Sequence, residues 1–139
     1  MNESDGAWVL SEATRDMIRA RIPSGGTILE FGSGKGTELL SRDFRVTAIE
    51  HDPDYLEIGD FRTIHAPIVH NATSEREGEF GWYNADIIKQ EIDNRYDLII
   101  IDGPPGTIGR SGVLEHTYLL QKSGAILVKK IEEAKHNLI

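Results

Sequence analysis

The chain has 139 residues, within the range of roughly 100–150 residues that is usual for one domain, so we expect a single domain over residues 1–139. With 39% hydrophobic and 27% charged residues, the composition is that of a globular protein with one core, which excludes disordered and collagen-like chains. The net charge of -8 disfavours nucleic acid and anionic membranes as partners. The absence of cysteine excludes disulfides and thiolate metal sites.

No apolar stretch reaches the roughly 18 residues needed to span a bilayer, and the acidic N-terminus lacks the basic and apolar regions of a signal peptide. A cytoplasmic location is therefore the expectation.

Residues 10–22 place apolar side chains at helical spacing, with Ser11 as N-cap and Pro23 after the end, which predicts an amphipathic helix. The apolar run at 27–31 then predicts a buried strand.

Glycines at 32–36 end this strand, and residues 37–42 can form a short helix. A second strand is predicted at 45–50, and Pro53 suits the first position of a helical segment that reaches about residue 59.

A third strand is expected at 64–69, where Pro67 favours an edge position because proline cannot donate to a neighbouring strand. Residues 70–84 are polar and rich in glycine, and they predict a loop or a loose hairpin. Three isoleucines between residues 87 and 92 indicate a short helix with one apolar face.

The most apolar run of the chain, at 96–102, predicts the central strand of a parallel sheet, ended by Gly-Pro-Pro-Gly at 103–106. A helix at 111–122 and a fifth strand at 125–128 complete the pattern. Alternating strands and helices predict a doubly wound, Rossmann-like α/β fold with a mostly parallel sheet of about five strands. The ligand crevice should lie between the ends of the first and fourth strands, where the strand order reverses.

The glycine-rich segment between Glu30 and Thr37 lets a ligand approach bare backbone and the N–H groups that begin a helix. A nucleoside-triphosphate P-loop would need a glycine where Leu29 stands and Ser or Thr where Gly36 stands. A dinucleotide fingerprint would need its third glycine at Thr37.

A third interpretation uses Glu30, before the glycines, and Glu50, at the end of the next strand. One carboxylate can accept both hydroxyls of a ribose, and a carboxylate beside the glycines favours a ligand with an ammonium group and repels a pyrophosphate. Together they favour a cationic nucleoside.

At these residues the chain resembles the class I S-adenosylmethionine-dependent methyltransferases, whose first motif is an acidic strand end followed by Gly-x-Gly-x-Gly and whose second motif is the acidic residue that closes the next strand. A narrower resemblance, from about residue 8 to 128, is to a group that includes the plant glucuronoxylan methyltransferases and uncharacterised bacterial proteins. It is carried by the segments Trp8–Ser11, Ile49–Pro53, His65–Pro67, Trp82–Tyr83 and Ile101–Gly106.

The resemblance implies S-adenosylmethionine as cofactor and methyl transfer to a small-molecule or sugar acceptor. The cofactor pocket that it implies consists of Glu30, Gly32, Ser33, Gly34, Gly36, Glu50, His51 and Asp52. Tyr83, with Trp82, could stack on the adenine or pack in the core. Asp102 is expected to position the acceptor or take its proton, with His116 as the second candidate base.

Two features depart from the family pattern. The fifth strand runs into Lys129 and Lys130, where related enzymes often have acidic residues, so we expect no metal site. Few residues follow Val128, so the usual C-terminal strand pair is missing, and the exposed strand edge predicts a homodimer or a missing segment.

Simpler roles remain for these residues. Glu30 can be a helix-capping carboxylate, Glu50 can face solvent, His51 can bond its own turn, and Asp102 can hold the turn after its strand. A non-catalytic S-adenosylmethionine-binding or protein-interaction domain is the alternative function, and a nicotinamide-dependent reductase is a third.

Overall fold

The computed structural model describes residues 11–56, 59–69, 81–93, 95–102, 123 and 126–128. Its helices are α2 (Glu12–Arg21), α3 (Lys35–Ser41), the 3-10 helix η1 (Pro53–Tyr55) and α5 (Ala85–Glu91). Its strands are β1 (Thr27–Phe31), β2 (Arg45–Glu50), β3 (Arg62–His65), β4 (Ile68–Val69), β5 (Trp82–Tyr83), β6 (Leu98–Ile101) and β7 (Ile126–Val128).

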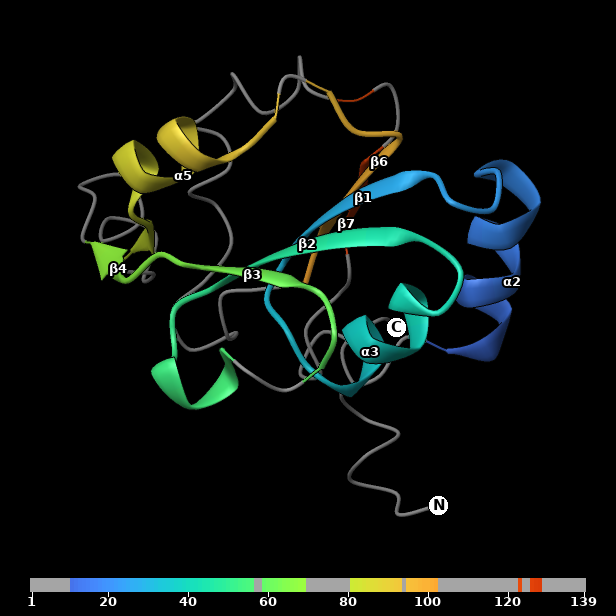
Figure 1. Cartoon of the computed structure of the whole chain (residues 1–139), viewed down its shortest axis with the longest axis horizontal. Coiled ribbons are helices and arrows are strands. Elements are labelled where there is room, and N and C mark those ends of the chain that lie inside the picture. The colour runs from blue at the N-terminus through green and yellow to red at the C-terminus, as the bar shows by residue number, and fades with distance from the viewer. Residues whose placement is uncertain are drawn as a thin grey trace, which may run out of the picture.

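Five strands form one parallel sheet in the order β3-β2-β1-β6-β7 (Figure 1). The chain moves outward from β1 to β3 and then returns to place β6 on the other side of β1. This reversal confirms the Rossmann-like α/β fold and the pairing of the first and fourth predicted strands. The strand predicted at 96–102 is β6, and the one predicted at 125–128 is β7.

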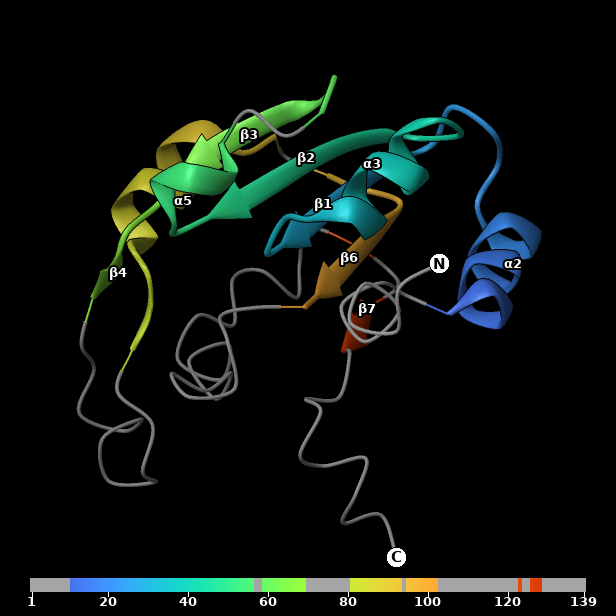
Figure 2. The same cartoon turned by 90° about the horizontal axis from the view of Figure 1, so that it is seen from below.

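Each face of the sheet has its own hydrophobic core, because successive side chains of a strand point to opposite faces. One core joins Ile18 of α2, Ile22 directly after this helix, and Leu40 of α3 to alternate residues of the central strands. The opposite core joins α5, β5 and Tyr96 to the other set of alternate residues, among them Leu29 and Ile99. Helix α5 lies at the opposite end of the molecule from α2 (Figures 1 and 2).

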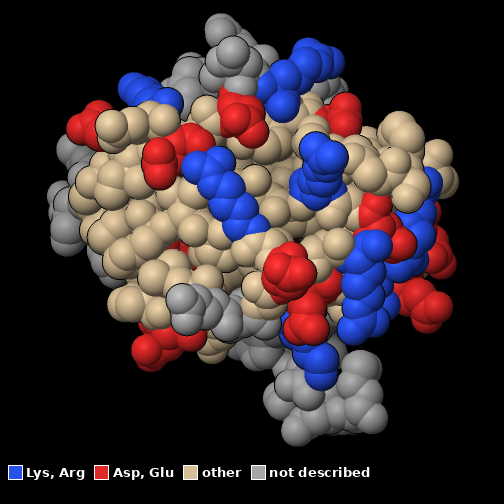
Figure 3. Space-filling model, in the orientation of Figure 1, with Lys and Arg blue, Asp and Glu red and all other residues tan. Residues whose placement is uncertain are grey.

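The helix predicted at 10–22 is α2, and the Ser11 hydroxyl accepts the N–H of Thr14 at 3.1 Å, which confirms the N-cap. Exposed ion pairs then join Arg19 of α2 to Asp16 at 3.0 Å and to Asp43 at 2.9 Å. On the face drawn in Figure 3, acidic and basic side chains of the described residues are interspersed in the same way.

The third strand was predicted as one segment, 64–69, and the structure divides it. β3 lies at the edge of the main sheet, as Pro67 suggested, whereas β4 pairs antiparallel with β5 in a separate sheet of two strands. Pro67 stands between them and cannot continue the ladder of N–H donors. The helix predicted at 111–122 lies outside the described residues.

Within the described part of the chain, no helix has the length and apolar character required to cross a bilayer.

Gly81 precedes β5, and a substitution at this position tests the packing of β5 on β4. A Cβ at this position would lie 2.7 Å from the carbonyl oxygen of Val69, which is backbone and cannot rotate away. We expect Gly81→Ala to lower the free energy of unfolding by about 1–3 kcal/mol in urea titrations. Gly34→Ala is the matched control, because a Cβ there meets nothing within 4 Å and should leave stability unchanged. Equal stability of the two variants would contradict this packing.

Candidate functional site at the carboxyl ends of the central strands

Gly32 lies between Glu50 and Asp102 at the carboxyl end of the sheet. The N–H of Gly32 donates to the Ile49 carbonyl at 2.7 Å, and the N–H of Asp102 donates to the Phe31 carbonyl at 2.9 Å. In a parallel sheet these two bonds place Gly32 level with Glu50 on one side and with Asp102 on the other. A position without a side chain therefore separates two carboxylates at the ends of β2 and β6, the two strands that flank β1.

The acidic residues of this region share one face of the sheet. Glu30 follows Ile28 on β1, Glu50 follows Ala48 on β2, and Asp102 follows Ile100 of β6, each by two positions. Because side chains two residues apart point to the same face, all three carboxylates lie on the side covered by α2 and α3. The sequence predicted each of them as a site residue, and the fold brings them to one edge.

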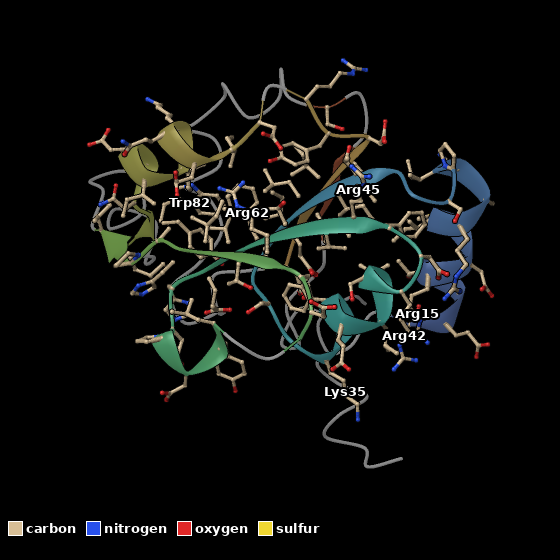
Figure 4. The ribbon with its side chains drawn as sticks, viewed as in Figure 1. Arg15, Lys35, Arg42, Arg45, Arg62 and Trp82 are labelled. Carbon is tan, nitrogen blue, oxygen red and sulfur yellow. The ribbon has the colours of Figure 1, made fainter. Side chains whose placement is uncertain are left out.

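The glycine loop leaves open space above the sheet edge that carries the three carboxylates. Gly32 has a φ of 97°, a conformation that favours glycine over residues with a side chain. At Gly34 a Cβ would meet none of the described residues within 4 Å, so open space lies beside the loop in the part of the chain that the structure describes. Gly36, in contrast, is buried in the first turn of α3. Lys35 is exposed and points away from the sheet (Figure 4), whereas a phosphate-binding lysine would fold back over the loop.

Glu50 is buried and is the centre of a hydrogen-bond network. Its Oε1 accepts the N–H of Ser33 at 2.9 Å and the hydroxyl of Ser33 at 2.8 Å. Its Oε2 accepts the N–H of Asp52 at 2.8 Å and lies 3.1 Å from Nδ1 of His51. Glu50 thus joins the glycine loop to the turn after β2, and the simpler alternative, in which Glu50 faces solvent, is wrong, since only 4% of it is exposed.

Glu30 lies beneath the other end of the loop. It is 2% exposed, and its Oε1 accepts the hydroxyl of Thr37 at 2.5 Å. The same hydroxyl oxygen accepts the N–H of Gly34 at 3.1 Å. The chain of contacts from Gly34 through Thr37 to Glu30 fixes the loop over the sheet.

The turn after β2 holds two further predicted site residues, His51 and Asp52. Asp52 caps η1 by accepting the N–H of Asp54 at 3.0 Å. His51 is partly exposed, and its backbone carbonyl accepts from Nε2 of His65 at 3.1 Å. Beside His51, the Tyr83 ring packs against Phe31 and Trp82 with no exposed surface, so in this structure it occupies the core and offers no open face to an adenine.

Asp102 is partly exposed and directly follows β6, and its predicted role toward an acceptor stays a prediction. His116 lies outside the described residues, and so does the loop at 103–110 that follows Asp102. Among the described ranges, no three histidine, aspartate or glutamate side chains gather to hold a metal ion.

Sequence reasoning missed two contacts of the site. Thr37 was noted as a departure from a dinucleotide fingerprint, and its hydroxyl instead bonds both Glu30 and Gly34. The Ser33 hydroxyl also donates to the Tyr55 carbonyl at 3.2 Å, which ties the loop to η1. The available signal was a residue with a hydroxyl group next to a glycine loop with buried carboxylates. Such carboxylates need hydrogen-bond donors.

Substitutions that remove two buried threonine hydroxyls test whether Thr37 fixes the glycine loop. Thr37→Val removes the donor to a buried carboxylate, and we expect a loss of about 1–3 kcal/mol in the free energy of unfolding. Thr63→Val is the matched control, because the buried Thr63 hydroxyl has no hydrogen-bond partner among the described residues, and its removal should be neutral or stabilising. Denaturant titration of both variants measures the difference, and equal losses would contradict the role of Thr37.

Comparison with known proteins gives one informative similarity. No protein-family model matches the chain, and no solved structure matches it at a significant level. A curated protein of Mycobacterium sp. (strain JLS), named "Putative O-methyltransferase", is 29% identical over 119 residues, which cover 81% of this chain and 52% of that protein. The chain thus spans about half the length of this relative. The similarity suggests a methyltransferase family and does not reach the glucuronoxylan-type group.

Proposed function

We propose that the protein binds S-adenosylmethionine at the glycine loop and transfers its methyl group to a hydroxyl of a small molecule or sugar. The observation that carries this proposal is the position of Gly32, level with Glu50 and Asp102 and beside the open space at Gly34. A methyl donor and its acceptor can meet where the two strands that flank β1 end without a side chain between them. The name of the mycobacterial relative supports an oxygen acceptor.

The charge of the site fits this cofactor. Glu30, Glu50 and Asp102 share one face of the sheet, and two of them are almost fully buried. Negative charge in a partly dehydrated site favours a ligand with a sulfonium and an ammonium group and disfavours a pyrophosphate. The negative charge of the site therefore favours S-adenosylmethionine over a nicotinamide dinucleotide.

In this mechanism the chain contributes mainly alignment. The cofactor supplies, when bound, an electrophilic methyl group on a positively charged sulfur. The Gly32–Gly36 loop holds the methionine portion, Glu50 and the His51–Asp52 turn hold the nucleoside, and Asp102 orients the acceptor hydroxyl and takes its proton. His116 is the second candidate for the base. A homodimer through the edge of β7 stays a prediction.

Gly34→Val tests the cofactor site. The substitution should leave folding intact, because Gly34 has an extended backbone and a Cβ there meets no described residue within 4 Å. Its side chain would fill the space that the proposal assigns to the ligand, so calorimetry should detect no binding of S-adenosylhomocysteine. Ala20→Val adds similar bulk on the exposed surface of α2 and should bind as the wild type does. Micromolar affinity retained by Gly34→Val would refute the loop assignment.

Asp102→Asn tests catalysis separately from binding. Removing the proton acceptor should lower the rate of radiolabelled methyl transfer to the best hydroxyl acceptor by about 100-fold or more. The affinity for S-adenosylhomocysteine should stay within about threefold, since an amide keeps the shape of the carboxylate. If the wild type binds the cofactor without transfer to any sugar or small hydroxyl compound, the non-catalytic binding domain replaces this proposal.

A further inference from the structure

Three successive backbone N–H groups of the glycine loop are bonded within the chain. The N–H of Gly32 donates to a carbonyl oxygen of β2 at 2.7 Å, and the N–H of Ser33 donates to Oε1 of Glu50 at 2.9 Å. The N–H of Gly34 donates to the hydroxyl oxygen of Thr37 at 3.1 Å. Loops that bind phosphates point such N–H groups at the anion. In this loop the chain itself supplies the acceptors.

The hydroxyl of Thr37 is held in one direction. Because an N–H can only donate, the hydroxyl oxygen is the acceptor in its contact with Gly34. The hydrogen of the hydroxyl points to Oε1 of Glu30, with 2.5 Å between the two oxygens. Thr37 is 1% exposed and Glu30 is 2% exposed, so water does not compete for either contact. The N–H of Gly34 thus meets an oxygen atom with a carboxylate behind it, much as it would meet an oxygen of a bound phosphate.

Gly34 is also the residue beside which a ligand has room. A Cβ there would meet none of the described residues within 4 Å. Gly34 is the N-cap of α3, and the Thr37 side chain reaches back to it from the first turn of the helix. A phosphate that enters the open space therefore finds the N–H of Gly34 already bonded. It would also approach the buried carboxylate of Glu30, whose charge repels it.

We propose that Thr37 is a specificity-determining residue of the glycine loop. Its hydroxyl, oriented by Glu30, occupies the N–H of Gly34 and so closes the loop to the phosphate groups of nucleotides. A nucleoside whose tail carries no phosphate does not need this donor and can enter. This role rests on the proposed function only for the ligand that the loop admits, and the exclusion of phosphates can be tested without it.

ADP and S-adenosylhomocysteine carry the same adenosine with different tails, so calorimetry with both ligands compares the tails. The wild type should bind ADP far more weakly than S-adenosylhomocysteine. Glu30→Gln removes the negative charge but keeps an oxygen that accepts from Thr37, so ADP binding should stay within about threefold of the wild type. Adding Thr37→Ala to Glu30→Gln releases the N–H of Gly34, and the affinity for ADP should rise about tenfold or more, since a hydrogen bond to a charged group is gained.

Two controls separate the hydroxyl of Thr37 from other effects of substitution. Adding Thr37→Ser to Glu30→Gln keeps the hydroxyl and should leave the ADP affinity at the level of Glu30→Gln alone. Adding Ser41→Ala instead removes a hydroxyl from the last turn of the same helix, where it donates to the Glu38 carbonyl at 2.6 Å, and should also leave the ADP affinity unchanged.

Nitrogen-15 NMR of the wild type tests the same point without any variant. The Gly34 amide should exchange slowly with water, and its signal should not move when ADP is added at millimolar concentration. Equal ADP affinities of Glu30→Gln with and without Thr37→Ala, or a Gly34 signal that shifts with ADP, would overturn the role of Thr37. If the wild type binds no S-adenosylhomocysteine while the double variant still gains affinity for ADP, the proposed function fails and the role of Thr37 stands.

Discussion

Two buried carboxylates need hydrogen-bond donors, and the glycine loop supplies them. An unpaired carboxylate in the interior costs several kcal/mol, so Glu30 and Glu50 at 2% and 4% exposure require partners. Glu30 takes the hydroxyl of Thr37, and Glu50 takes the N–H and hydroxyl of Ser33. Hydrogen bonds to buried carboxylates thus fix both ends of the loop between β1 and α3. They keep the space beside Gly34 open without a bulky side chain to support the loop.

The parallel sheet brings these groups together. The order β3-β2-β1-β6-β7 makes β2 and β6 the neighbours of β1, although β6 is far from β1 along the chain. Residues that end the three strands therefore meet at one edge, with Gly32 between Glu50 and Asp102. The same order places β3 at the edge, so that its last residue, His65, approaches the backbone of His51.

Much of the fold follows from local sequence pattern. Continuous apolar runs predicted β1 and β6 because both faces of a central parallel strand are buried, and Ser11 marked the beginning of α2. The division of the third strand at Pro67 and the pairing of β4 with β5 were missed, since two-residue strands carry no periodicity. For the site, strand ends and glycines located Glu30, Gly32 and Glu50. Their partners could not be predicted, because the contact of Thr37 with Glu30 depends on how the glycine loop folds back over the strand, and the contact of Tyr83 with Phe31 depends on packing between segments distant in the sequence.

The most direct measurement is a titration of the nitrogen-15-labelled protein with S-adenosylhomocysteine, followed by backbone amide chemical shifts. The account predicts saturable shifts concentrated at Gly32–Thr37, at Glu50–Asp52 and at Asp102, and none of comparable size with NADH at equal concentration. Shifts that spare the glycine loop, or that NADH reproduces, would contradict the assignment of this edge of the sheet to a cationic nucleoside.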